Sequence, residues 1–300
     1  MKRRFSTLLL SALAVVAVGG LTLLRTGLTA EAARQDWTPL VTKNYPVTGT
    51  FTDISITGYY EDIYLRPSRD GTVSVTTRDA ESVTHTVSVA NGVLSISRPE
   101  PDSTGDRLFF HDSDPELILY LPAGDYGALS VSTMSGDVQT ASRLAFSAAN
   151  FTTISGDVEL YSSVSGNVVC NTTSGDIELR CPTAGAVQAV TTSGDVELND
   201  SYVQSLSVES TSGDVDLERS TAAGAVEIST VSGEISLERS DAASLTLSTT
   251  SGEIEGSLLS AKNFSVTSTH GRVQVPDSDP TAGACTISTT TGSVWITIRP

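Results

Sequence analysis

The sequence is poor in aromatic residues and in positive charge. Aromatic residues make up 6% of its 300 residues, and 18 Lys and Arg stand against 35 Asp and Glu, for a formal net charge of −17. Proteins that bind nucleic acid need Lys and Arg to neutralise phosphates, so this balance argues against a nucleic-acid partner. The scarcity of aromatic residues fits a thin core of Val, Leu and Ile.

Cysteine is also scarce, and its three copies, Cys170, Cys181 and Cys285, lack the spacing of a metal site. Free cysteine is readily buried, so we expect small core residues. A Cys170–Cys181 disulfide is the alternative in an oxidising compartment. Either interpretation leaves Cys285 unpaired.

One short phrase is abundant: Ser-Gly, then an acidic residue, then an aliphatic one. It occurs at 135–138, 155–158, 174–177, 193–196, 212–215, 232–235 and 251–254, with two worn copies at 270–273 and 291–294. Successive glycines from Gly136 to Gly271 lie 19 or 20 residues apart. A fixed period of this length is typical of repeat architectures.

Each repeat contains two runs in which apolar and polar residues alternate, as in strands with one buried face. Small or turn-prone residues recur halfway between the glycines and are expected to form a second turn: Ser147, Gly166, Gly185, Ser205, Gly224, Ser244, Asn263 and Gly283. A unit of two strands cannot bury its apolar face alone, but a stack of units can. The sequence therefore predicts an all-β fold, a parallel β-solenoid (β-helix) of about nine coils over residues 131–300.

Within the phrase, glycine is expected where the backbone takes a positive φ or passes close to the next coil. The Thr that precedes several phrases, as at Thr153 and Thr230, can accept hydrogen bonds from turn amides.

Residues 37–130 are also rich in strand patterns but lack the period, and we expect an irregular N-terminal β cap. Asp70-Gly71 and Asn91-Gly92 are typical of hairpin turns. A cap would protect the open strand edge from pairing with other chains. The segment 294–296, Val-Trp-Ile, is expected to cap the other end. A polar insert at 99–115 interrupts the pattern and is a possible contact loop.

Residues 1–34 are expected to lie outside the fold. A basic start, Lys2-Arg3-Arg4, precedes an apolar run from Leu8 to Leu24, which indicates export. Two interpretations remain open: a cleaved signal peptide, or an uncleaved membrane anchor with the rest of the chain outside the cell.

Carboxylates are the candidate site residues. The acidic residue of each phrase would stack along one edge of the solenoid, as a ladder of Asp137, Asp157, Asp176, Asp195, Asp214, Glu234 and Glu253. A second ladder lies two residues further on: Glu159, Glu178, Glu197, Asp216 and Glu255. Their spacing of about 5 Å is only the coil rise repeated, not a local catalytic pair. His85, His111 and His270 are scattered, so we expect no enzyme.

Ca²⁺ could relieve the repulsion between stacked carboxylates. Calcium-binding β-rolls, however, use Gly-Gly-x-Gly-x-Asp at a nine-residue period, and this chain has one Gly and one acid per unit. A solvated acidic edge that keeps the solenoid soluble is the main interpretation. Binding of Ca²⁺ or of cationic peptides is the alternative, and no other cofactor is expected.

The phrases, together with Val93-Leu94-Ser95-Ile96 and Leu119-Tyr120-Leu121-Pro122-Ala123-Gly124, resemble the DUF4097 family over about residues 45–298. That family is described as "putative adhesins", bacterial cell-surface β-helix proteins. The resemblance implies a non-enzymatic surface protein that binds a component of the cell surface or envelope, or acts as a scaffold. An envelope-associated sensor ectodomain whose acidic edge binds cationic peptides or Ca²⁺ is the alternative.

Overall fold

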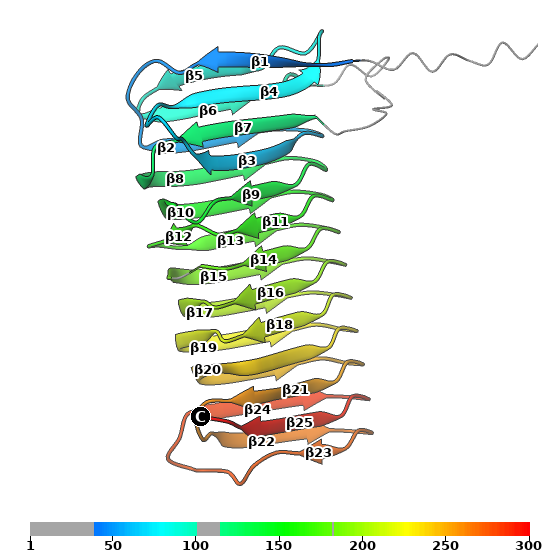
Figure 1. Ribbon diagram of the computed structural model, residues 1–300. Helices are drawn as coiled ribbons and strands as arrows, with labels where there is room; N and C mark the ends of the chain where they lie inside the picture. Colours follow the sequence, from blue (N-terminus) through cyan, green and yellow to red (C-terminus); the bar gives the residue numbers. More distant parts are fainter. Residues whose placement is uncertain (1–38, 101–114, 182) are drawn as a thin grey trace, which may run out of the picture. The chain divides into compact units, whose positions relative to one another are not determined.

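Alternating apolar and polar residues build two facing sheets, called sheet A and sheet B, whose strands are parallel except near the N-terminus (Figure 1). The computed structural model describes residues 39–100, 115–181 and 183–300. In one representative coil, β18 (Val215–Glu218) lies in sheet A and β19 (Thr221–Ser229) in sheet B. Val215 and Leu217 are buried between the sheets and Asp216 is exposed, as a period of two requires. The predicted β-solenoid is confirmed.

Sheet A begins with antiparallel strands and continues as a parallel stack. In spatial order its strands are β1 (Leu40–Pro46), β4 (Ser74–Ala80), β7 (Glu116–Leu121), β3 (Asp62–Pro67), β9 (Val138–Thr140), β11 (Val158–Leu160), β14 (Ile177–Leu179), β16 (Val196–Asn199), β18, the first part of β20 (Ile235–Ser248), β21 (Ile254–Leu258), β25 (Val294–Ile298) and β23 (Val273–Gln274).

Sheet B runs alongside in the same order of coils. Its strands are β5 (Thr86–Ala90), β6 (Val93–Ser97), β2 (Asp53–Thr57), β8 (Gly124–Ser132), β10 (Leu144–Thr152), β12 (Ser163–Val164) with β13 (Val168–Asn171), β15 (Ala184–Val190), β17 (Tyr202–Glu209), β19, the second part of β20, β24 (Ala284–Thr289) and β22 (Asn263–Ser268).

The N-terminal strands include one hairpin, not two. Asn91 and Gly92 have φ values of 52° and 80° and join β5 to β6, which pair antiparallel, so this hairpin prediction is confirmed. Asp70-Gly71 joins β3 to β4, and these two strands pair with β7 rather than with each other. The second hairpin prediction was therefore wrong, although Gly71 does have a positive φ of 75°.

At both ends of the stack, the order of coils in space differs from their order in the chain. β2 and β3 lie between the β6–β7 coil and the β8–β9 coil. At the other end, β24 and β25 lie between β20–β21 and β22–β23 (Figure 1). The expected cap at 294–296 was therefore wrong: β25 is an inner strand, and β22 and β23 form the last coil. The worn copy at 270–273 belongs to that last coil.

The phrase glycines stack directly on one another. A Cβ on Gly213 would lie 1.7 Å from the carbonyl oxygen of Gly194, and the other phrase glycines meet the preceding coil at similar distances. None of these glycines is among those with positive φ. Close approach of neighbouring coils is thus confirmed as the reason for glycine, and positive φ is not. The Thr153 and Thr230 hydroxyls accept hydrogen bonds from the N–H of Gly156 and Gly233, as expected.

The second set of expected turns was only partly right. Gly166 lies in the bend between β12 and β13, and Gly283 lies just before β24. Ser205 and Ser244, however, lie inside sheet-B strands, and the pairing of β17 with β19 shifts register between Val203 and Leu206. The corner between the sheets instead follows the end of each sheet-A strand, near Asp200, Arg219 and Arg239, which all have positive φ.

All three cysteines are buried, free thiols. Cys170 takes an inward aliphatic position, with Phe151 and Ala189 as its register partners. Burial raises the pKa of Cys181 and of Cys285 to about 12, and it raises the pKa of Cys170 as well. The thiols are therefore core residues, and the alternative disulfide is not formed.

Two expected features, the export signal or anchor at 1–34 and most of the insert at 99–115, lie outside the described residues. Within the described part of the chain, no helix is long and apolar enough to cross a membrane.

Candidate functional site

The acidic ladder lies along the edge of sheet A where each strand begins, as predicted. Its rungs are joined through the backbone: the N–H of Asp176 donates to the Asp157 carboxylate at 2.8 Å, and the N–H of Asp195 donates to the Asp176 carboxylate at 2.8 Å. The same bond links Asp157 to Asp137, Asp214 to Asp195, and Glu234 to Asp214. The carboxylates therefore brace one coil against the next.

The ladder has a first rung that sequence analysis missed. The Asp62 carboxylate accepts the Asp137 N–H at 3.0 Å from a coil without the Ser-Gly phrase. The signal was present as an acidic residue directly before an alternating run, Asp62-Ile63-Tyr64-Leu65. Within the described residues, the carboxylates of Glu234 and Glu253 accept no hydrogen bond from a backbone N–H of the next coil. This difference follows from the longer Glu side chain, which places its oxygens beyond the next backbone amide.

The second ladder occupies the outer face of sheet A, one register pair above another. Glu159 pairs with Glu178, Glu178 with Glu197, and Glu197 with Asp216. Partial burial, together with neighbouring carboxylates, raises the pKa of Asp157, Asp216 and Glu234. Repulsion between the carboxylates of the two ladders is thus only partly relieved by hydrogen bonds.

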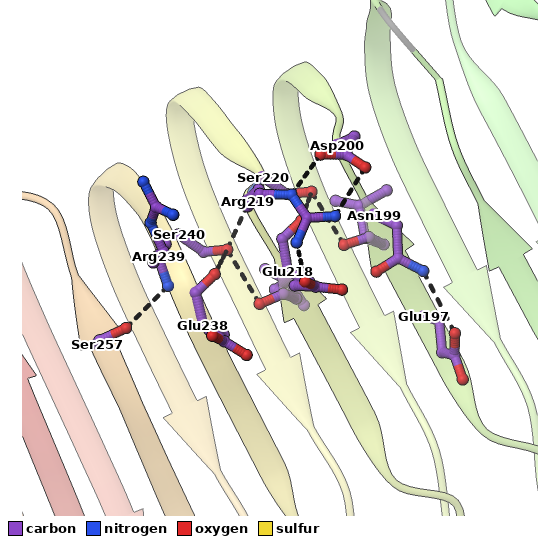
Figure 2. A network of polar contacts seen from close by, with 12 residues as sticks. Glu197, Asn199, Asp200, Glu218, Arg219, Ser220, Glu238, Arg239, Ser240 and Ser257 are labelled. Carbon is purple, nitrogen blue, oxygen red and sulfur yellow. Dashed lines mark hydrogen bonds and ion pairs between the residues drawn. The ribbon is translucent and has the colours of Figure 1, made fainter.

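Arginine and serine side chains border the acidic face at the corner of the coils (Figure 2). Arg219 donates to the Asp200 carboxylate of the preceding coil at 2.6 and 2.9 Å and also contacts Glu218. Behind it, buried serines form a further ladder, in which the Ser220 N–H donates to the Ser240 hydroxyl at 3.0 Å. The corners are therefore held by a polar network that the sequence did not reveal.

A hollow on the outer face of sheet A surrounds Trp295, which is 56% exposed. The register places Trp295 between Glu255 in β21 and Gln274 in β23. The hollow has a volume of about 300 Å³, and its other lining residues include Glu238, Ser257, Thr297 and Arg299. An exposed indole next to carboxylate, hydroxyl and guanidinium groups can stack on a ligand while they hydrogen-bond to it.

A buried polar cluster ties the N-terminal strands together and was missed because its members are far apart in the sequence. Arg98 donates to Asp79 at 2.8 Å and lies 3.4 Å from Glu61, and His85 Nε2 lies 3.6 Å from Glu61 Oε1. The Glu61 carboxylate also accepts the N–H groups of the two residues before it. All four side chains are at most 4% exposed, so a substrate cannot reach them. His85 thus has a structural role, away from the other histidine in the described residues, His270.

The described residues contain no group of three or more His, Cys, Asp or Glu side chains arranged to hold a metal ion. The ladder carboxylates lie in single file and bind backbone amides, which is unlike the converging oxygens of a calcium site.

Comparisons with known proteins agree with this architecture. A family model described as Toastrack DUF4097 matches residues 51–258. A search of curated proteins gave no significant match. The chain is similar to the solved structure of a "putative lipid binding protein" from Parabacteroides distasonis, with 17% identity, a TM-score of 0.52, and coverage of 86% of this chain and 96% of the other.

Two further solved structures are similar in coverage. A "putative adhesin" from Parabacteroides distasonis is 15% identical, with a TM-score of 0.48 and coverage of 87% and 98%. A "putative adhesin" from Bacteroides fragilis is 15% identical, with a TM-score of 0.46 and coverage of 86% and 96%. Because the family model matches well over half of the sequence, the chain belongs to the Toastrack DUF4097 family.

Proposed function

We propose that this chain is a non-enzymatic bacterial cell-surface protein that binds a component of a cell surface or envelope through the outer face of sheet A. The observation that carries the proposal is Trp295, which is exposed in a polar hollow on the otherwise regular outer face of sheet A. Large aromatic side chains exposed on a rigid surface are typical anchors of binding sites. The adhesins described in the family are consistent with this role.

The proposed location is the outside of the cell. The basic start and apolar run of residues 1–34 would hold the chain in the membrane, or secrete it if they are cleaved. The excess of acidic residues favours solubility of the solenoid and discourages association between the outer faces of its sheets.

The test is binding of the purified full chain to intact bacterial and host cells at low and high salt. We expect saturable binding that survives high salt and that falls at least about tenfold in Trp295→Ala, as for an interface anchor. Tyr202→Ala is the matched control, because Tyr202 is 52% exposed but lies in sheet B. Equal binding by wild type and Trp295→Ala would exclude the hollow as the site.

The alternative function is a sensor ectodomain whose acidic face binds cationic peptides or Ca²⁺. The stacked carboxylates favour it: after burial, neighbouring carboxylates also raise the pKa of Asp157, Asp216 and Glu234, and a cation would relieve that repulsion. Such binding is mainly electrostatic and is expected to disappear at high salt. Salt dependence thus separates the two functions.

A further inference from the structure

One departure from the repeat is a basin at the junction between the parallel stack and the antiparallel strands. It has a volume of about 1020 Å³ and is lined by Arg66 and Pro67 at the end of β3, Ser68, Arg69 and Asp70 in the following loop, Ser74 in β4, Tyr120 in β7, and Ala141 and Arg143 after β9. The basin arises because the chain leaving β3 does not turn into sheet B but continues into β4, which pairs with β7.

Three arginines in one basin are unexpected in a chain of net charge −17. Within the described residues, Arg66, Arg69 and Arg143 form no ion pair. Arg66 lies over the Tyr64 ring at 4.7 Å and donates to Gln139 at 3.4 Å. Arg180 and Arg219 are ion-paired by contrast, with Glu178 at 2.8 Å and with Asp200 at 2.6 Å. The basin therefore concentrates positive charge that the protein leaves uncompensated.

The one acidic residue of the basin is already engaged. The Asp70 carboxylate accepts hydrogen bonds from the Thr72 N–H at 3.0 Å and the Thr72 hydroxyl at 2.8 Å, which lower its pKa. The Ser68 N–H donates to the Leu121 carbonyl at 2.6 Å. The loop is thus fixed at both ends before any ligand binds, and the basin keeps an excess of two positive charges.

We propose that this arginine basin (Arg66, Arg69 and Arg143) binds a phosphate group carried by a larger molecule. Guanidinium groups present paired donors that match phosphate oxygens. Three guanidinium groups offer more donors than the two oxygens of one carboxylate can accept. Tyr120 and Ser74 add hydroxyl donors, and the buried Ser68 hydroxyl has no partner among the described residues. The basin, at about 1020 Å³, has room for a phosphate ester that is part of a polymer or a lipid headgroup.

The inference goes beyond the surface-binding function, since it concerns a different place on the solenoid and a different ligand chemistry. The two proposals can fail independently. Trp295→Ala could abolish cell binding even if the arginine basin binds no phosphate. The basin could bind phosphate even if Trp295→Ala has no effect on cell binding.

The experiment compares the full chain with two double variants of equal charge, each checked for an unchanged melting temperature. Arg69→Gln/Arg143→Gln removes two of the three guanidinium groups of the basin. Arg180→Gln/Arg239→Gln removes two guanidinium groups outside it. The probes are inorganic phosphate, a glycerol phosphate polymer, and vesicles of phosphatidylglycerol compared with phosphatidylcholine, with acetate as a competing carboxylate. Binding is measured by calorimetry or equilibrium dialysis at several salt concentrations.

We expect saturable binding of a phosphate probe, at least about tenfold weaker in the basin variant and within about twofold of wild type in the control variant. Acetate should not compete at equal concentration. The tightest probe identifies the source: the polymer, the lipid headgroup, or phosphate alone. No binding of any probe, or equal losses in the two variants, would overturn the proposal. So would vesicle binding that neither variant changes, because it would then belong to residues 1–34.

Discussion

At the residue scale, the fold depends on positions where only a hydrogen atom fits between coils. The phrase glycines meet the carbonyl oxygen of the neighbouring coil, and from Gly156 onward the N–H of each donates to a Thr or Ser hydroxyl three residues earlier. These requirements recur in every coil, so the sequence period revealed them directly. A positive φ at a residue such as Arg219 leaves no comparable mark in the sequence, and this explains why the corner was misplaced.

Gly213→Ala is therefore expected to destabilise the protein strongly. The new Cβ would lie 1.7 Å from the Gly194 carbonyl oxygen, so the coils must separate, at a cost of about 3 kcal/mol or more. Thermal unfolding followed by circular dichroism should show a lower melting temperature. Gly124→Ala is the control, because nothing lies within 4 Å of its Cβ position. Equal melting temperatures for the two variants would contradict the close approach.

At the scale of elements, the acidic ladder is a brace between coils. The sequence placed every rung from Asp137 to Glu253 correctly along one edge, since register follows from the repeat. It could not show that the carboxylates accept backbone amides, because that depends on the distance between coils. Nor could it join Glu61, Asp79, His85 and Arg98, which meet only through the folding of separate N-terminal strands.

Substitutions at Asp195 separate the brace from a cation site. Asp195→Ala leaves the Asp214 N–H without its acceptor and should cost about 1 kcal/mol. Asp195→Asn keeps an acceptor oxygen and removes one repelling charge, so it should be close to wild type in stability at pH 7. Denaturant unfolding with and without Ca²⁺ measures both effects. If Asn were as harmful as Ala, and Ca²⁺ stabilised only the wild type, the ladder would be a calcium site instead.

The pH dependence of stability should follow from the same carboxylates. Asp157, Asp216 and Glu234 have pKa values raised by burial and by neighbouring charge, so protonation favours their folded state. Their contribution is full below the unfolded pKa and is lost as pH rises through the folded pKa. The melting temperature should therefore rise as pH falls from neutral through the raised pKa values toward the unfolded values of about 4.

At lower pH the trend should reverse. Hydrogen bonds from Thr72, Arg219 and Thr281 lower the pKa of Asp70, Asp200 and Asp279, and this stabilisation is lost as pH falls through their folded pKa values. A variant with Asp157→Asn, Asp216→Asn and Glu234→Gln should lose the rise on acidification from neutral pH and keep the fall below about pH 4. A steady decline from pH 7 in the wild type would refute this assignment.

At the scale of the whole described unit, the repeat builds a regular solenoid, and the features suited to binding are departures from the repeat. The sequence period predicted the solenoid but not the spatial order of its coils. Every coil presents a similar set of buried apolar residues, so one coil could stack on nearly any other. The final coil of the chain lies inside the stack, and this places Trp295 between Glu255 and Gln274 on the outer face of sheet A instead of at an end. The Trp295 hollow depends on that order.

Hydrogen exchange of the full chain, resolved by peptide, tests this order most directly. β25 pairs with β21 along residues 294–298 and with β23 at Val294 and Trp295, whereas β23 pairs only with β25. The amides of Val294 and Trp295 should exchange as slowly as those of the inner strand β18, and amides of residues 263–274 should exchange much faster. Fast exchange at Val294 and Trp295 with slow exchange at 263–274 would show that the last coil of the chain caps the stack, and the Trp295 hollow would then not exist as described.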